Sequence, residues 1–146
     1  MMYKQILLAT ELANKNTDIE KKALELQQLT QAKLSIINVV EYLSPVYMGG
    51  EMGVLAQNLP TEEVLMQNAE AAIKNAANRL NISAEDRILV SGRAADEILS
   101  SAEDIGADLI IVGSHGRHGL QLLLGSTANA ILHHAKCDVL ALRIHD

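Results

Sequence analysis

The chain has 146 residues, of which 49% are hydrophobic and 21% are charged, so its size and composition are typical of a single globular domain spanning residues 1–146. Its 12 basic and 18 acidic side chains give a formal net charge of −6, and its 3 aromatic residues are all tyrosine, so we expect no nucleic-acid partner. The single cysteine, Cys137, excludes an internal disulfide and a cysteine-pair zinc motif. No apolar run approaches the roughly 20 residues of a membrane span and no signal-peptide pattern opens the chain, so we expect a cytoplasmic protein without a membrane partner.

Five short apolar runs predict strands that are buried on both faces of a parallel sheet. They are rich in Leu, Ile and Val, and glycine or polar residues bound them. The runs cover residues 6–9, 34–40, 87–90, 109–112 and 139–142. Because runs of this length are also compatible with buried helix, the segments between them decide the assignment.

The segments between the runs repeat apolar residues at steps of three and four, which predicts amphipathic helices. The predicted helices cover residues 17–31, 61–80, 96–105 and 126–135. Thr61 stands before two glutamates, which is typical of a helix start, and Gly106 suits the left-handed residue after a helix. The alternation of strand and helix predicts right-handed crossovers and an α/β domain with one open, five-stranded parallel sheet and helices on both faces.

A long irregular stretch, residues 41–59, separates the second predicted strand from the next helix and contains Pro45 and three glycines. Loops of this length are usually functional or mobile inside a domain of this size. We consider two interpretations: the stretch covers a pocket or a partner, or it is a surface insertion that packs on its own helix. The second is the more common use of such a segment.

The glycine-rich segment 112–127 begins where the fourth predicted strand ends and finishes where the last predicted helix starts. Gly113 and Gly116 lack a Cβ, so the backbone can turn sharply there and approach a ligand closely. At residues 125–127 the free amides of a helix start, its dipole and two hydroxyl groups converge. Two such runs of amides facing each other can hold an anion such as a di- or triphosphate.

The place of this segment agrees with where open parallel sheets bind ligands, beyond the carboxyl ends of the strands at the point where the strand order reverses. We expect Glu11 and Val39, which follow or end the first two strands, on the same rim. The phosphate motifs GxxxxGK[ST] and GxGxxG are absent, and so is the GxSxG nucleophile elbow. Glycine spacing alone therefore leaves both nucleotide binding and ordinary turn glycines open.

Four segments together resemble the universal stress protein A family, and the resemblance spans the whole chain. They are KQILLATE at 4–11, ADLIIVGSHG at 107–116, LGSTA at 124–128 and HAKCDVL at 134–140. The resemblance implies a Rossmann-like parallel sheet of order 3-2-1-4-5 and a homodimer. One branch of the family binds ATP through the signature G-x2-G-x9-G-[ST], and another branch lacks these glycines. This chain keeps the signature residues at Gly113, Gly116, Gly125 and Ser126, which places it with the ATP-binding branch.

The resemblance also implies a set of nucleotide-binding residues and ATP as the cofactor, with any Mg²⁺ carried by the phosphates. The set is Ala9, Glu11, Val39, Val112, Gly113, His115, Gly116, Gly125, Ser126 and Thr127. The amides of His115, Gly116 and Ser126 and the hydroxyls of residues 126 and 127 correspond to phosphate contacts; Ala9, Val39 and Val112 correspond to the adenine side. Two features depart from the family: eight residues, 117–124, replace the nine of the spacer, and Glu11 replaces an aspartate.

Other chemistry finds little support in the sequence. The histidines do not have the spacing of a zinc site, and Cys137 is better explained as a small packed residue than as a redox group. Ser126 has no recognisable base, so we assign no catalytic residue and expect at most slow ATP hydrolysis or autophosphorylation. A PP-loop such as SGGxDS, which the wider superfamily of adenine-nucleotide hydrolases uses, is absent after the first strand.

These observations predict a cytoplasmic stress-response protein that binds ATP at the glycine-rich segment and acts as a nucleotide-dependent regulator. The alternative is a nucleotide-free dimeric interaction module of the same fold. In a 3-2-1-4-5 order the last strand, residues 137–144, lies at the edge of the sheet, with apolar side chains and no proline. Such an edge favours pairing with another chain, so we expect an antiparallel homodimer through this strand.

Overall fold

The computed structural model describes residues 2–11, 17–42, 50, 60–115 and 125–144. Its strands are β1 (Gln5–Ala9), β2 (Lys33–Val40), β3 (Arg87–Ser91), β4 (Leu109–His115) and β5 (Asp138–Ile144). Its helices are α1 (Thr17–Thr30), α3 (Glu62–Arg79), α4 (Ala94–Ile105) and α5 (Ser126–His134), with a short 3-10 turn, η3, at Ala84–Asp86. The strands form one parallel sheet of order β3-β2-β1-β4-β5, which confirms the predicted fold.

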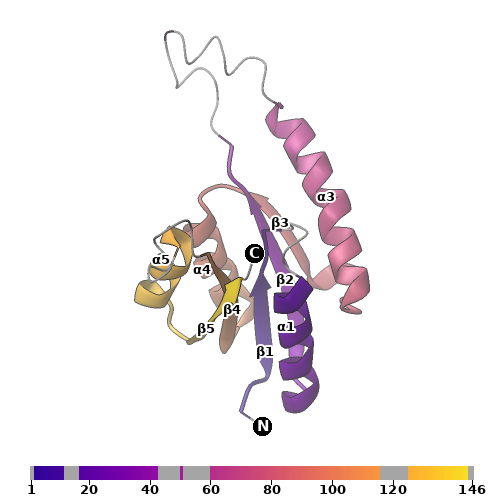
Figure 1. Ribbon diagram of the computed structural model, residues 1–146, viewed down its shortest axis with the longest axis vertical. Coiled ribbons are helices and arrows are strands. Elements are labelled where there is room, and N and C mark those ends of the chain that lie inside the picture. Colours follow the sequence, from indigo (N-terminus) through magenta and orange to yellow (C-terminus); the bar gives the residue numbers. More distant parts are fainter. Residues whose placement is uncertain (1, 12–16, 43–49, 51–59, 116–124, 145–146) are drawn as a thin grey trace.

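Helices cover both faces of the sheet, α1 and α3 on one side and α4 and α5 on the other (Figure 1). The alternation of β1 shows why two cores form: Ile6 and Leu8 point to the first pair of helices and Leu7 points to the second, and all three are fully buried. The large buried side chains of both cores are aliphatic, as the near-absence of aromatic residues predicts. Within the described residues, no helix has both the length and the apolar character needed to cross a membrane.

Two carboxylates hold the strands together at their amino-terminal ends. The N–H groups of Lys4 and Gln5 donate to the Asp108 carboxylate at 2.8 and 3.1 Å, which ties the start of β1 to the start of β4. The Tyr3 hydroxyl donates to Asp138 at 2.9 Å, and this bond raises the pKa of Tyr3. Strands β1 and β4 are therefore held together at one end, and the helices that follow them, α1 and α5, lie on opposite faces of the sheet, because the strand order reverses between these strands.

Strand β4 extends further than the sequence predicts. It was expected to end at Val112, but it continues to His115 because Gly113 and the next two residues pair with the last residues of β5. Gly113 therefore lies within a strand and makes no turn, and its backbone φ is not positive.

Helix α4 begins at Ala94, two residues before the predicted start at residue 96. The reason is a distant cap: the Ala94 N–H donates to Glu41 Oε1 at 2.7 Å across a sequence separation of 53 residues. The other helix signals are confirmed. Thr61 Oγ1 accepts from the Val64 N–H at the start of α3, and Gly106 adopts the left-handed conformation after α4.

Candidate functional site

A cavity of about 340 Å³ opens at the carboxyl ends of β1, β2 and β4. The strand ends and the first turns of α4 and α5 form its walls, with one residue from α1. Its lining residues are Ala9, Thr10, Glu11, Ile19, Ile37, Asn38, Val39, Glu41, Ala94, Ile98, Val112, Gly113, Thr127 and Ala128. The cavity lies where the strand order reverses, which is the place where open parallel sheets bind ligands.

Most of the residues that the sequence predicts for nucleotide binding meet in this cavity. The predicted residues that line it are Ala9, Glu11, Val39, Val112, Gly113 and Thr127. Gly125 and Ser126 stand directly before Thr127, at the start of α5. The backbone of His115 ends β4, whereas its side chain and Gly116 lie outside the described residues.

The start of α5 offers free backbone donors to the cavity. Helix α5 follows Gly125, which makes no side-chain cap, and its first turn contains no acidic residue. The first N–H groups of a helix have no intrahelical acceptor, and the helix dipole adds positive potential there. Because Thr127 and Ala128 line the cavity, this donor group lies at its wall and is suited to an anion.

Gly125 is not needed for the conformation of the chain. Its φ of −60° and ψ of 155° are accessible to any residue. A Cβ built at this position meets no atom of the described residues within 4 Å. Neither backbone strain nor packing in the described part of the chain therefore requires a glycine at this position.

At the opposite end of the cavity, the buried side chain of Asn38 lies where the pairing of β1 with β2 ends. The Thr10 N–H donates to the Ile37 carbonyl at 3.0 Å, and Asn38 Nδ2 donates to the Thr10 carbonyl at 2.7 Å. Asn38 is 8% exposed, so this bond is shielded from water. The Asn38 side chain thus holds the chain at the point where it leaves β1 for the rim of the cavity.

The alternation of peptide groups along β2 directs those of Val39 toward the cavity. The carbonyl of Val40 accepts from the Gly92 N–H at 3.1 Å, in the direction of β3. Because successive residues of a strand present their N–H and C=O groups to opposite sides, those of Val39 face the side of β1, beyond Thr10. Val39 accordingly lines the cavity with a donor, an acceptor and an apolar side chain.

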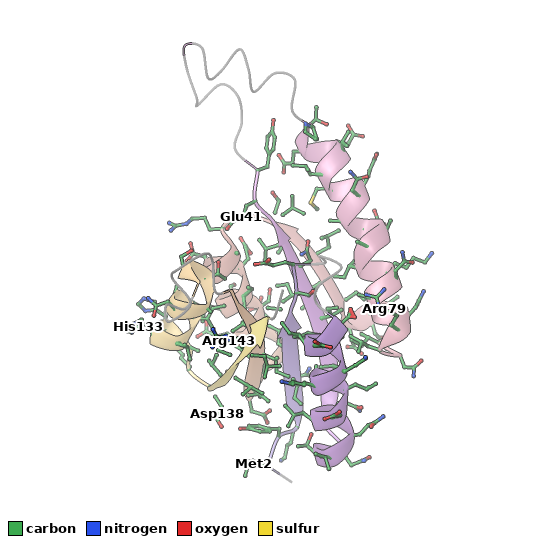
Figure 2. All side chains as sticks on the ribbon, viewed as in Figure 1. Met2, Glu41, Arg79, His133, Asp138 and Arg143 are labelled. Carbon is green, nitrogen blue, oxygen red and sulfur yellow. The ribbon has the colours of Figure 1, made fainter. Side chains whose placement is uncertain are left out.

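Glu41 makes this end of the cavity acidic. It follows β2, and Figure 2 shows it at the end of the sheet opposite to Met2 and Asp138. Its carboxylate lines the cavity and caps α4 through the Ala94 N–H. The acids in the first turn of α4, Asp96 and Glu97, do not line the cavity, and Asp96 lies 3.8 Å from Arg93 in an ion pair. The two ends of the cavity therefore differ in charge preference: the α5 end favours an anion, and the Glu41 end repels one.

Sequence reasoning missed Thr10, Ile19, Ile37, Asn38, Glu41, Ala94, Ile98 and Ala128 among the lining residues. Thr10, Asn38 and Glu41 carried a usable signal, because each is a polar residue inside or just after a predicted buried strand, at its carboxyl end. The remaining residues are apolar or small and resemble ordinary core positions. Among the residues that the structure describes, no group of three or more His, Cys, Asp and Glu is placed to hold a metal ion.

A second hollow, of about 510 Å³, follows the outer side of α4 and reaches Lys136 and Cys137 before β5. It is larger than the first, but it lies at the carboxyl ends of α4 and α5, where free carbonyl groups gather. Burial raises the pKa of the Cys137 thiol, with Asp138 and Asp108 adding to the effect. The thiol is therefore less reactive than an ordinary one, which agrees with a packing role.

Comparisons with known proteins agree on one protein family. The model of the Universal stress protein family matches residues 2–143. A relative from Coxiella burnetii, "Universal stress protein A homolog 2", is 48% identical over 143 residues, which cover 97% of this chain and 96% of the relative.

Solved structures agree at the level of the fold. Universal stress protein UspA from Lactobacillus plantarum superposes with a TM-score of 0.73 at 23% identity, covering 98% of this chain and 99% of that protein. A universal stress protein solved in complex with cAMP superposes with a TM-score of 0.69 at 21% identity, covering 98% of each chain.

Proposed function

The chain belongs to the universal stress protein family, and we propose that it binds an adenine nucleotide, ATP, in the cavity at the carboxyl ends of β1, β2 and β4. Mg²⁺ is carried by the phosphates. Occupancy of the site biases the shape or the contacts of the protein, which acts as a nucleotide-dependent regulator in the cytoplasm with slow or no hydrolysis. The observation that carries this proposal is the start of α5, which has no acid, no side-chain cap and a glycine that nothing in the described fold requires.

The phosphate end of the site is the start of α5. The amides of Ser126 and Thr127 and their hydroxyls are the donors, in the position where helix dipoles favour a phosphate group. Gly125 leaves room for the phosphate oxygens to approach the backbone. The amides of His115 and Gly116 complete this end in the proposal, on the family signature that these residues match.

The base end of the site is formed by β1, β2 and β4. Ala9, Val39 and Val112 offer apolar side chains to the faces of a purine ring, and the Val39 peptide offers a donor and an acceptor to its edge. Strands in a sheet lie about 4.8 Å apart, so β2 and β4, which flank β1, are separated by about 10 Å. That separation suits a nucleotide with its base over β2 and its phosphates beside β4. The related protein solved with cAMP supports an adenine nucleotide as the ligand class.

A calorimetric titration of nucleotide-stripped protein with Mg·ATP tests the proposal. We expect the wild type to bind and Gly125→Val to lose most of its affinity, because the valine side chain occupies the space of the phosphate oxygens. Ser83→Val is the control, since it places the same side chain at the N-cap of η3, away from the cavity. Thermal unfolding establishes that each variant is folded. A wild type that binds no nucleotide would favour the alternative, a nucleotide-free interaction module.

We also propose that the protein is a homodimer that pairs β5 with β5 of a second copy. Strand β5 lies at one edge of the sheet, with β4 as its neighbour. Adjacent residues of a strand direct their N–H groups to opposite sides. In one of the two variants Ala141→Pro and Leu142→Pro, proline therefore removes an N–H that bonds to β4. In the other it removes an N–H that points away from β4, toward a second copy. We expect the variant that loses the N–H pointing away from β4 to keep its fold and to sediment as a monomer. A wild type that sediments as a monomer at every concentration would contradict the dimer.

A further inference from the structure

Glu41 makes a contact inside the candidate site that its sequence position does not explain. The residue lines the cavity at the end of β2 (Figure 2), and its Oε1 accepts from the Ala94 N–H at 2.7 Å. The N-cap residue of α4, Arg93, makes no side-chain cap of its own. Glu41 therefore supplies the cap of α4 from another strand, and one carboxylate oxygen is fixed in place by a backbone amide.

The second oxygen of Glu41 has no hydrogen-bond partner among the residues that the structure describes. An ionised carboxylate accepts hydrogen bonds and donates none. Since Oε1 is held by Ala94, the group that remains for a ligand is an acceptor of fixed orientation at the wall of the cavity. A ligand that meets this wall is favoured when it presents a donor there and disfavoured when it presents a second acceptor.

The charge of Glu41 also decides which end of a nucleotide meets it. The start of α5 attracts the phosphates, whereas the Glu41 carboxylate, which lines the cavity, repels them. The base therefore lies on the side of β2, beside Val39 and Glu41. Purine bases differ at this kind of contact, because a 6-amino group is a donor and a 6-oxo group is an acceptor.

We infer that Glu41 is a specificity-determining residue, which makes the site prefer a purine nucleotide with a 6-amino group over one with a 6-oxo group. This inference rests on the proposed nucleotide function and adds the group that discriminates between bases. The hydrogen bond is made at the rim, where Glu41 is exposed, so its contribution is that of an ordinary hydrogen bond. We expect the wild type to bind Mg·ATP roughly fivefold more tightly than Mg·ITP, whose base has a 6-oxo group in place of the 6-amino group and carries a proton on N1.

Glu41→Gln tests the inference with little change of shape. The glutamine oxygen still accepts from the Ala94 N–H, so the amide nitrogen must take the place of the second carboxylate oxygen. The wall then presents a donor, and the preference shifts toward ITP; we expect the ratio of the ATP and ITP affinities to fall at least about fivefold. Glu41→Ala presents neither group and should bind both nucleotides with nearly equal affinity. Glu70→Gln, on the exposed surface of α3, is the control and should keep the wild-type ratio.

The outcomes separate this inference from the proposed function. A shifted ratio in Glu41→Gln, with the wild-type ratio retained in Glu70→Gln, supports it. An unchanged ratio in Glu41→Gln, while ATP still binds, overturns the role of Glu41 and leaves the proposed function standing. A wild type that binds neither nucleotide overturns both.

Discussion

The first turns of α4 and α5 both border the cavity, but they differ in the acidic and capping side chains that accompany them. Each presents the free N–H groups and the positive dipole end that any helix start has. At α4 the chain supplies Asp96 and Glu97 in the first turn and the Glu41 carboxylate as a cap. At α5 it supplies no acid and no side-chain cap. The two helix starts are therefore alike in their backbone, and only that of α4 carries acids and a carboxylate cap.

The other described helices follow the pattern of α4. Helix α1 has Asp18 and Glu20 in its first turn, and α3 has a Thr61 cap followed by Glu62 and Glu63. Both lie on the face of the sheet away from α4 and α5 (Figure 1). Acid at a helix start stabilises a helix by a few tenths of a kcal/mol, so its absence from α5 forgoes a common source of stability. The absence of acidic residues from a helix start is expected where a ligand supplies the negative charge.

Gly125→Asp makes the start of α5 resemble that of α4 and should have the largest effect. The aspartate caps the free amides and repels phosphate, so we expect the affinity for Mg·ATP to fall by about 100-fold or more. The same cap should raise the free energy of unfolding by a few tenths of a kcal/mol. Calorimetric titration and urea unfolding measure the two effects, which have opposite signs for function and stability.

The control for this variant is Gln67→Glu, which changes the net charge equally on the exposed surface of α3, away from the cavity. We expect it to bind ATP like the wild type. Equal loss of affinity in the two variants would mean that overall charge is the cause. Undiminished binding in Gly125→Asp would mean that the phosphates do not meet α5.

Asn38→Leu acts on the opposite end of the cavity. It removes the buried donor of the Thr10 carbonyl while keeping a side chain of similar size. Loss of a buried partner costs about 1–3 kcal/mol, so we expect that decrease in the free energy of unfolding by urea denaturation. Asn78→Leu, at an exposed position of α3, should change it much less. Equal stability of the two variants would show that the Asn38 amide does not hold the end of β1.

Glu41→Ala removes the cap of α4 and should have a smaller effect on stability. Loss of a helix cap costs about 1 kcal/mol, which for a chain of this size lowers Tm by roughly 2–4 °C. Glu41→Gln retains the acceptor for the Ala94 N–H and should lower Tm less than Glu41→Ala. Differential scanning calorimetry measures both. If the two variants melt together at the wild-type temperature, α4 does not depend on this cap.

The sequence predicts the fold more completely than it predicts the site, and the reason is physical. The strands and helices follow from local periodicity, and even Gly106 and Thr61 carry local signals for their helix ends. The Glu41 cap joins residues 53 positions apart, and the bond from Asn38 to Thr10 spans 28. Such contacts exist only after β2 is placed beside β1 and the start of α4 is brought to the end of β2. Local patterns cannot place them.

The α5 end of the cavity was predictable because its determinants are local: Gly125, Ser126 and Thr127 are consecutive, and a helix start needs no distant partner. The opposite end of the cavity combines residues from β1, β2 and α4, which only the tertiary structure joins. The extension of β4 to His115 was missed for the same reason, because it depends on pairing with β5. The two ends of the cavity therefore differ in predictability as they differ in charge.

The smallest expected effect concerns the far end of α5, where Cys137 follows the helix. Burial raises the pKa of its thiol, so at a given pH less of it is thiolate in the folded protein than in the unfolded chain. We expect iodoacetamide to alkylate Cys137 several-fold more slowly in buffer than in urea at pH 8, with both rates rising with pH. A thiol that binds its proton more tightly when folded contributes stability below its unfolded pKa, and this contribution is lost as the pH rises through the folded pKa. An alkylation rate in buffer equal to that in urea would mean that Cys137 is accessible and ionises like a free thiol, and the packing role argued for it would fail.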